Sequence, residues 1–329
     1  MKKIFSFLAP VLFVANLSAQ QDPLFTKYMF NSLVLNPAYA GSEGYLSTGL
    51  LHRSQWFGLK GGPQSQTLTI HSPMKNERVG LGGSLINDAL GATNTFTGNV
   101  CYAYRIPLKS WMLSVGLQGG AQYYNFDATK VTTASPDVVF TSYSKLRPNF
   151  GGGIYLKKDR KYYVGLGVPH LIEWNLREKT NGSKDTLAKE FRHYFFTAGA
   201  AFPINGDALI FKPSLMVRNT GLFNNFNKTA YYKGYLAPTS FDIDLSLFFY
   251  QTLWLGASYR SALEQFNGKS SFSSVNAWGA YYLKNGMRVG LSYDYNLTVL
   301  QKATAGSFEL FLGYDFDFRV NRVATPRYF

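Results

Sequence analysis

Residues 307–318 read SFELFLGYDFDF, and apolar residues occupy every second position of this stretch. The even-numbered positions are all aromatic or aliphatic: Phe308, Leu310, Leu312, Tyr314, Phe316 and Phe318. The odd-numbered positions include the carboxylates of Glu309, Asp315 and Asp317. Successive side chains of a β-strand point to opposite faces, whereas a helix would scatter these residues around its axis. The stretch therefore predicts a strand with one apolar and one polar face.

The same alternation recurs along the chain, for example in residues 241–249 and 288–295. Extending this reading predicts fourteen strands, and several have the length of about 9–11 residues that a tilted strand needs to cross a bilayer. The predicted strands are 45–53, 65–71, 79–87, 94–106, 111–124, 147–157, 161–168, 191–202, 207–218, 240–249, 252–260, 271–283, 287–295 and 306–318.

The connections between these strands fall into two classes that alternate strictly. Tight turns follow even-numbered strands at 107–110, 158–160, 204–206, 250–251 and 284–286, and two of them contain the hairpin signal Asn-Gly. Longer segments follow odd-numbered strands at 125–146, 169–190, 219–239 and 261–270. Short periplasmic turns that alternate with long outer loops are typical of outer-membrane barrels. We therefore expect the long loops outside and both termini at the periplasmic face.

The first nineteen residues have the three zones of a secretory signal peptide. Lys2 and Lys3 supply positive charge, residues 4–17 are almost wholly apolar, and Ser18-Ala19 offer small residues for cleavage before Gln20. A retained N-terminal anchor is the alternative, but the apolar zone is shorter than the roughly 20 residues that a spanning helix needs. Every later apolar run is also too short, so a membrane-embedded form of this chain must be a closed barrel.

Period-two alternation alone does not separate a membrane barrel from a secreted β-sandwich or a soluble barrel. The strand number, the loop asymmetry and the aromatic load of 23 Tyr and 27 Phe, with only 16% charged residues, favour the membrane barrel. The sequence therefore predicts an all-β protein, an outer-membrane antiparallel β-barrel of about fourteen strands over residues 45–318. Residues 20–44 are predicted to be a periplasmic or plug-like segment, and residues 319–329 a periplasmic tail.

In such a barrel the polar faces line the lumen. Charges of both signs occur there, which favours a mutually paired interior over a single-sign ion filter. The candidate lumen charges are Arg105, Lys212, Asp242, Asp244, Arg260, Arg288, Asp294, Glu309, Asp315 and Asp317. Residues 20–44, rich in Tyr, Phe and Asn, are the candidate filler.

Motifs for catalysis, metal or cofactor binding are not evident. The four histidines are not spaced as zinc ligands, and no nucleophile-elbow signature occurs. Gly80-Leu81-Gly82-Gly83 lacks the Lys-Ser/Thr ending of a phosphate loop, and Cys101 is alone. We therefore expect no enzyme activity, no cofactor and no metal. The net charge is +14, or +12 without Lys2 and Lys3. This basic excess is consistent with charged, soluble loops, with contact to the anionic outer leaflet or with an acidic protein partner. Because the chain is predicted to be exported, we do not expect it to bind nucleic acid.

Several motifs resemble the PorP/SprF family in both kind and order. They are residues 21–31 (QDPLFTKYMFN), 36–41 (NPAYAG), 53–56 (RSQW), 62–63 (GP), 66–67 (QT), 71–73 (HSP), 79–82 (VGLG), 87–88 (ND), 104–108 (YRIPL) and 326–329 (PRYF). The matching order spans most of the mature chain, although the detailed motifs lie mainly in its first third. The signature positions, whose roles the resemblance does not assign, are Tyr28, Asn31, Asn36, Pro37, Tyr39, Gly41, Arg53, Trp56, Asn87, Asp88 and Arg105.

The resemblance implies a non-catalytic outer-membrane component of the type IX secretion and gliding-motility machinery. It implies partners of three kinds: outer-membrane lipid and lipopolysaccharide, the C-terminal region of a secreted adhesin, and periplasmic type IX secretion components. A passive porin for small solutes is the alternative function. An outer-membrane hydrolase is a third possibility, which would need a serine or histidine site facing the bilayer or the outer loops.

Overall fold

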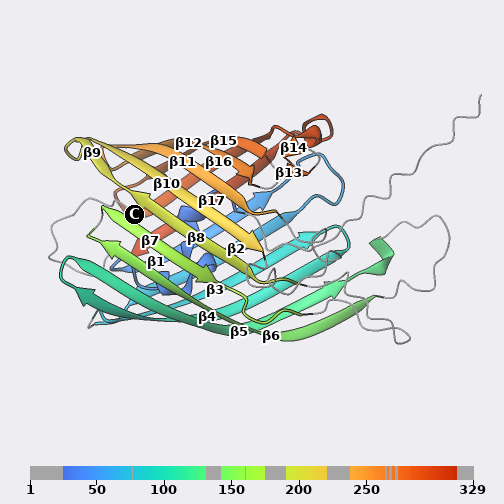
Figure 1. Cartoon of the computed structure of the whole chain (residues 1–329), viewed down its shortest axis with the longest axis horizontal. Coiled ribbons are helices and arrows are strands. Elements are labelled where there is room, and N and C mark those ends of the chain that lie inside the picture. The colour runs from blue at the N-terminus through green and yellow to red at the C-terminus, as the bar shows by residue number, and fades with distance from the viewer. Residues whose placement is uncertain are drawn as a thin grey trace, which may run out of the picture.

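The computed structural model describes residues 25–75, 77–130, 142–159, 161–174, 190–220, 238–263, 265–266, 269–270 and 273–316. The predicted signal peptide, Asp317, the tail at 319–329 and most of the longest predicted loops lie outside these residues. Within the described part, fourteen antiparallel strands close into a barrel, with one further short strand beside them (Figure 1).

The strand bounds agree with the predicted ones to within a few residues. The barrel strands are β1 (Leu46–Ser54), β2 (Gln64–Pro73), β3 (Val79–Leu90), β4 (Thr93–Leu108), β5 (Trp111–Phe126), β6 (Tyr143–Lys158), β7 (Tyr162–Val168), β8 (His193–Ala200), β10 (Leu209–Thr220), β11 (Ser240–Phe249), β12 (Leu253–Ala262), β15 (Ser273–Tyr282), β16 (Met287–Asn296) and β17 (Ser307–Phe316). The two-residue strands β13 (Gln265–Phe266) and β14 (Lys269–Ser270) pair with each other.

One predicted strand, 191–202, is interrupted. β8 ends at Ala200, and the chain continues after Ala201 as the short strand β9 (Phe202–Asn205), which pairs with β10 alone. Pro203 lies within β9 and has no N–H to offer a second neighbour, which suits a strand that is paired on one side only.

The pairing of the first strand with the last closes the ring of strands, and the pairing of β10 with β11 continues it in chain order. β1 pairs with β17 from Leu46↔Phe316 to Ser54↔Phe308, and β10 pairs with β11 from Leu209↔Phe249 onward. The remaining neighbours follow chain order. Closure gives each strand a partner on both sides at membrane depth, as a chain in lipid requires, because lipid cannot hydrogen-bond to free backbone groups. A two-layer sandwich is therefore wrong for this chain.

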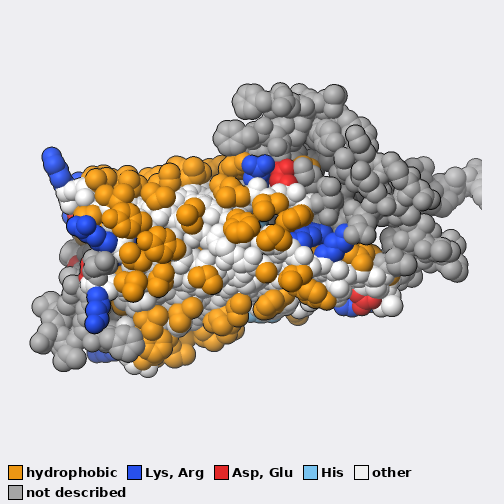
Figure 2. Space-filling model, turned by 90° about the horizontal axis from the view of Figure 1, so that it is seen from below, with side chains coloured by type: hydrophobic (Ala, Val, Ile, Leu, Met, Phe, Trp, Pro, Cys, Tyr) orange, Lys and Arg blue, Asp and Glu red, His pale blue; other side chains and the backbone are white. Residues whose placement is uncertain are grey.

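The faces of the strands are inverted relative to a soluble protein. On β16 and β17 the apolar residues Leu291 and Leu310 are 60% and 43% exposed, whereas Asp294 and Glu309 are each only 2% exposed. Figure 2 shows hydrophobic side chains over the flank of the barrel, with Lys and Arg gathered toward its ends. Such a broad exposed apolar belt marks a surface that lipid covers. No helix among the described residues has the length and apolar character to cross a bilayer.

The two ends of the barrel differ. We call the end with the connections 109–110, 159–161, 206–208, 250–252 and 283–286 the turn end, and the opposite end the loop end. The predicted strict alternation is wrong at one place, because β3 and β4 at the loop end are joined by Gly91 and Ala92 alone. β4, β5 and β6 have 16 residues each, and at the loop end they extend farther than β7 (Figure 1).

Residues 25–44, which we call the inner segment, run through the lumen. They form three short turns of helix, η1 (Tyr28–Phe30), α1 (Ser32–Leu35) and η2 (Pro37–Tyr39), enclosed by the strands in Figure 1. The Phe25 carbonyl accepts a hydrogen bond from Arg260 near the loop end, and Gly41 lies against Pro73 at the turn end. The first described residues therefore lie near the loop end, whereas the termini themselves, predicted at the turn end, lie outside the described residues.

The face assignment predicts the effect of a charge at lipid depth. Leu312 lies midway along β17 on the lipid side, so Leu312→Arg should lower the free energy of unfolding by about 2–4 kcal/mol, and Leu312→Val by less than about 1.5 kcal/mol. Reversible guanidinium unfolding in lipid vesicles measures both. Equal costs for the two variants would mean that Leu312 does not face lipid.

Candidate functional site in the barrel lumen

The inner segment approaches the barrel wall so closely that the wall must lack side chains there. A Cβ atom built on each of four inward-facing glycines would lie 2.0–2.1 Å from a backbone or Asn36 atom of the segment. The four are Gly80 on β3, Gly116 on β5, Gly153 on β6 and Gly167 on β7. Only glycine permits this approach, so these positions form a groove that fits residues 35–40.

Asn36 shapes the segment within this groove. Its Oδ1 accepts the N–H of Ala38 at 3.0 Å, which caps η2, and Pro37 supplies the first helical position. Its Nδ2 donates to the carbonyl of Ile154 on β6 at 3.0 Å. One side chain thus both starts the helical turn and attaches it to the wall.

The opposite wall carries four buried carboxylates near the loop end, which we call the acidic wall: Asp242, Asp244, Asp294 and Glu309. Glu309 accepts the backbone N–H groups of Thr26 and Lys27, one on each carboxylate oxygen, both at 2.9 Å. The Thr26 hydroxyl donates to Asp294 at 2.5 Å. The wall therefore binds the backbone of the inner segment as well as its side chains.

Three cations pair with these four carboxylates, and one of the cations comes from the inner segment. Arg53 pairs with Asp294 at 2.7 Å and with Glu309 at 3.1 Å, and Arg260 pairs with Asp242 through two hydrogen bonds. Lys27 supplies the third charge. Buried ions are costly unless they are paired, so the wall depends on the segment for its electrostatic balance.

Lys27 is enclosed by donors, acceptors and an aromatic ring. Its ammonium donates to Asp244 at 3.0 Å and to Ser258 at 2.9 Å, and it lies 4.8 Å from the centroid of the Trp278 ring. The Trp278 indole N–H donates to the same Asp244 oxygen at 2.8 Å. Tyr28 then extends the attachment by donating to Ser214 at 2.7 Å.

An aromatic cluster packs under these charges. Phe30 stacks on Phe311 with ring centroids 4.5 Å apart and meets Trp254 and Trp278 edge-on at 5.4 and 5.7 Å. Aromatic side chains bury much apolar area and favour such geometries. The segment is therefore held by apolar burial as well as by ions.

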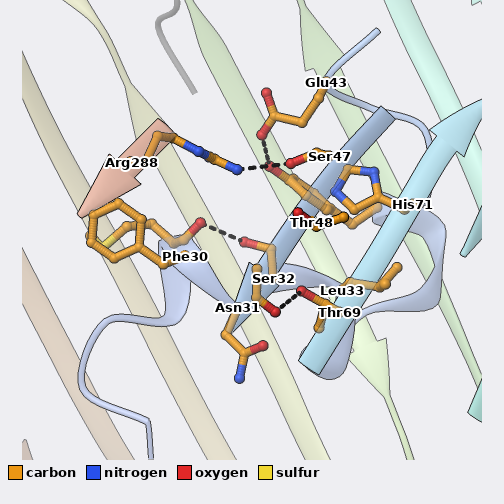
Figure 3. Close-up of a pocket in the computed structure, with 13 residues that line it drawn as sticks. Phe30, Asn31, Ser32, Leu33, Glu43, Ser47, Thr48, Thr69, His71 and Arg288 are labelled. Atoms are coloured by element: carbon orange, nitrogen blue, oxygen red, sulfur yellow. Dashed lines mark hydrogen bonds between the residues drawn. The ribbon is translucent and has the colours of Figure 1, made fainter. Parts of the chain in front are cut away.

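A small polar cavity of about 20 Å³ remains beside the inner segment, large enough for ordered water. Figure 3 shows it between Ser32 and Phe30 on one side and Thr48, His71 and Arg288 on the other. Arg288 donates to Ser47 and pairs with Asp315, both at 2.8 Å. Leu51, next inward on β1 toward the loop end, is 1% exposed within an apolar cluster.

The loop after β7 fills a second part of the lumen. Gln118 donates to the carbonyl of Pro169, and His170 makes a hydrogen bond with Asn149 at 2.8 Å. Farther along the same connection, Glu190 accepts a hydrogen bond from Gln122 at 2.9 Å. The lumen is thus occupied both by residues 25–44 and by parts of residues 169–192.

The structure gathers most of the predicted lumen charges into ion pairs, but two differ from the rest. Lys212 lies over the Trp254 ring, 3.4 Å from its centroid. Arg105 is 4% exposed, and its Nε and Nη1 have no hydrogen-bond partner in the part of the chain that the structure describes. Asp317 lies outside the described residues.

The family-signature positions divide between two places. Eight of them are buried in the lumen: Tyr28, Asn31, Asn36, Pro37, Tyr39, Gly41, Arg53 and Arg105. Trp56 follows β1 at the loop end, where its backbone N–H donates to the Ser307 hydroxyl. Asn87 donates to Gln66, and Asp88 accepts from Ser65, both near the loop end of β3.

Sequence reasoning missed Thr26, Lys27 and Trp278. Most of their hydrogen-bond partners lie more than 200 residues away in the chain, so spacing gives no signal. The exceptions are the contacts of Thr26 with Arg53 and of Trp278 with Asp244. A lysine within the aromatic stretch LFTKYMF was the available hint. Among the described residues, no cluster of three or more His, Cys, Asp or Glu side chains could hold a metal ion.

Comparison with known proteins gives a family match. A family model described as "Type IX secretion system membrane protein PorP/SprF" matches residues 17–314, which confirms the resemblance seen in the sequence. No curated protein sequence matches the chain. Among solved structures, the CymD monoaromatic hydrocarbon channel is 14% identical over 88% of this chain and 93% of its own, with a TM-score of 0.51. The Acinetobacter baumannii outer membrane protein Omp33 is 10% identical over 83% of this chain and 100% of its own, with a TM-score of 0.45.

The dependence of the acidic wall on Lys27 can be measured by a double-mutant cycle. Lys27→Met leaves a buried carboxylate without its cation and should cost about 3–5 kcal/mol of unfolding free energy. Asp244→Asn in the Lys27→Met background should recover part of this loss, and the exposed control Lys75→Met should cost less than about 0.5 kcal/mol. Additive losses in guanidinium unfolding would contradict a direct Lys27–Asp244 pair.

The glycine groove predicts a way to displace the inner segment without opening the barrel. Gly116→Val should drive residues 37–39 off the wall, so that trypsin cleaves after Lys27 on the order of tenfold faster in the detergent-solubilised protein. Gly119→Val on the same strand is the control, because its Cβ would lie 3.8 Å from the Phe150 ring, an ordinary contact. Equal cleavage of both variants would mean that the segment does not depend on the groove.

Proposed function

Because the chain belongs to the PorP/SprF family, we propose that it is a non-catalytic outer-membrane component of the type IX secretion and gliding machinery. In this role it assists the secretion or surface attachment of one partner adhesin and receives that adhesin's C-terminal region. The barrel sits in the outer membrane and anchors the site; the partner binds to it.

One observation carries this proposal: the lumen is filled from both directions. The inner segment crosses it from the acidic wall to the turn end, and residues 169–174 and 190–192 enter it from the loop end. A barrel whose interior is used to hold its own chain is suited to present a fixed surface to another protein.

The proposed orientation places the long loops outside and the turn end in the periplasm. Lipid and lipopolysaccharide surround the apolar flank, the secreted adhesin meets the loop end, and periplasmic type IX secretion components meet the turn end. The loop asymmetry of the barrel supports this arrangement, because outer-membrane barrels carry their long loops on the outer side.

A passive porin is the second candidate, and the polar cavity beside residues 29–33 is the observation that favours it. The likeness to the CymD hydrocarbon channel, at 14% identity, concerns the fold alone. Leu51 and Phe311, 1% and 3% exposed, belong to the buried apolar cluster next to this cavity, which disfavours a continuous aqueous path.

Deletion of the gene tests the proposal in the native bacterium. We expect surface display of one large adhesin to be lost, at least about tenfold by cell-surface proteomics, while other type IX cargo is exported normally. A gene copy carrying Leu291→Val, a conservative change on the lipid side, should restore display and serves as the control. Normal display after deletion, together with steady planar-bilayer conductance of the unaltered protein, would favour the porin instead.

A further inference from the structure

β6 has a strand partner along only part of one edge. It pairs with β5 over its full length, from Phe126↔Tyr143 to Trp111↔Lys158, but with β7 only from Gly152 to Lys158. The loop-end half of β6 therefore lacks a strand neighbour on its β7 side within the described residues. This step arises because β7 ends at Val168, while β6 continues about nine residues farther toward its own start.

The loop after β7 covers only the first part of this free edge. Leu171 donates its N–H to the carbonyl of Phe150 at 2.8 Å, and the Trp174 indole donates to the carbonyl of Pro148 at 3.3 Å. Beyond Pro148, toward the tip, the Arg147 guanidinium lies 3.9 Å from the Glu190 carboxylate of this loop, but no described loop residue bonds to the backbone of Ser144 or Leu146. We call residues 143–147 the β6 edge.

The direction of the backbone groups on the β6 edge follows from these contacts. In an antiparallel strand the N–H and C=O of one residue point to the same side, and alternate residues share a side. Because the Phe150 and Pro148 carbonyls point toward β7, the N–H and C=O of Leu146 and Ser144 do so as well. These four groups have no hydrogen-bond partner among the described residues, and they are the groups that a new strand would pair with.

The side chains beside these groups also suit a bound strand. Leu146 is 73% exposed, among the highest values of any large apolar side chain in the described residues. Leu146 lies near the start of β6, in the part that does not pair with β7. Figure 1 shows β6 reaching beyond β7 at the loop end. Lys145 and Pro148 flank Leu146, and residues of these two types limit unspecific pairing at the edges of natural sheets.

We propose that the β6 edge is a docking site for an extended segment of the secreted partner, which adds to the barrel sheet as an antiparallel strand. The segment places an apolar residue beside Leu146 and pairs with the backbone of Ser144 and Leu146. This inference rests on the proposed function and names the surface that carries it.

Two other occupants fit the edge less well. The chain between Trp174 and Glu190 contains no Val, Ile, Phe, Tyr or Trp, so its composition disfavours a strand that would cover the edge. A second copy inserted in the same direction would bring its own β6 alongside in a parallel direction, and parallel pairing is slightly less stable per residue.

Photo-crosslinking in living cells tests the proposal. A benzoylphenylalanine placed at Ser144 should crosslink to a secreted adhesin, identified by mass spectrometry of the joined peptides. Leu146→Pro removes one free N–H and leaves the β5 ladder intact, just as Pro148 does two residues away. It should lower both the crosslink and the surface display about fivefold, whereas Leu146→Ala should change them at most about twofold.

The outcomes separate this inference from the proposed function. Unchanged display in Leu146→Pro, in a strain background where gene deletion abolishes display, would overturn the β6 edge and leave the proposed function standing. Crosslinks to residues 175–189 or to a second copy of the chain would overturn it as well. Faster migration of the unheated protein in detergent gels, equal in both variants, verifies that each barrel is folded.

Discussion

The closed ring of fourteen strands is the constraint on which the rest of this structure depends. Lipid offers no hydrogen bonds, so every strand at membrane depth needs a neighbour on both sides, and the pairing of β1 with β17 completes the circle. Closure also sets the width of the lumen. A barrel of this strand number encloses more space than its own inward side chains fill, and that space must hold either water or more protein.

This chain fills the space with itself, and the two walls of the lumen are built differently for that purpose. On β3, β5, β6 and β7 the wall has glycines at the inward-facing contact positions, so that the backbone of residues 35–40 can lie against it. On β11, β16 and β17 the wall is acidic and receives Thr26 and Lys27. Backbone proximity on one side and ion pairing on the other hold one short segment that has little regular structure of its own.

The same tilt that closes a barrel also leaves its strand ends at different heights. Strands β4, β5 and β6 continue beyond β7 at the loop end, and this creates a short free edge on β6. In lipid the unpaired N–H and C=O groups of such an edge would have no hydrogen-bond partner. In water they bond to water molecules, which another strand can displace. The free edge of β6, which results from the barrel geometry, can therefore bind a strand of a partner protein.

The sequence by itself determined the strands, their faces and the family, because period-two alternation depends only on neighbouring residues and survives in any part of the chain. It predicted that Glu309 and Asp315 share a face opposite Leu310 and Leu312, and the burial of these carboxylates agrees. Only the tertiary structure decided which charges meet. Lys27 and Asp244 are separated by 217 residues, and Thr26 and Glu309 by 283, so no local pattern could join them. Two further features depend on how the closed ring brings distant strands into register. They are the direction of the inner segment through the lumen and the distance by which β6 extends beyond the end of β7.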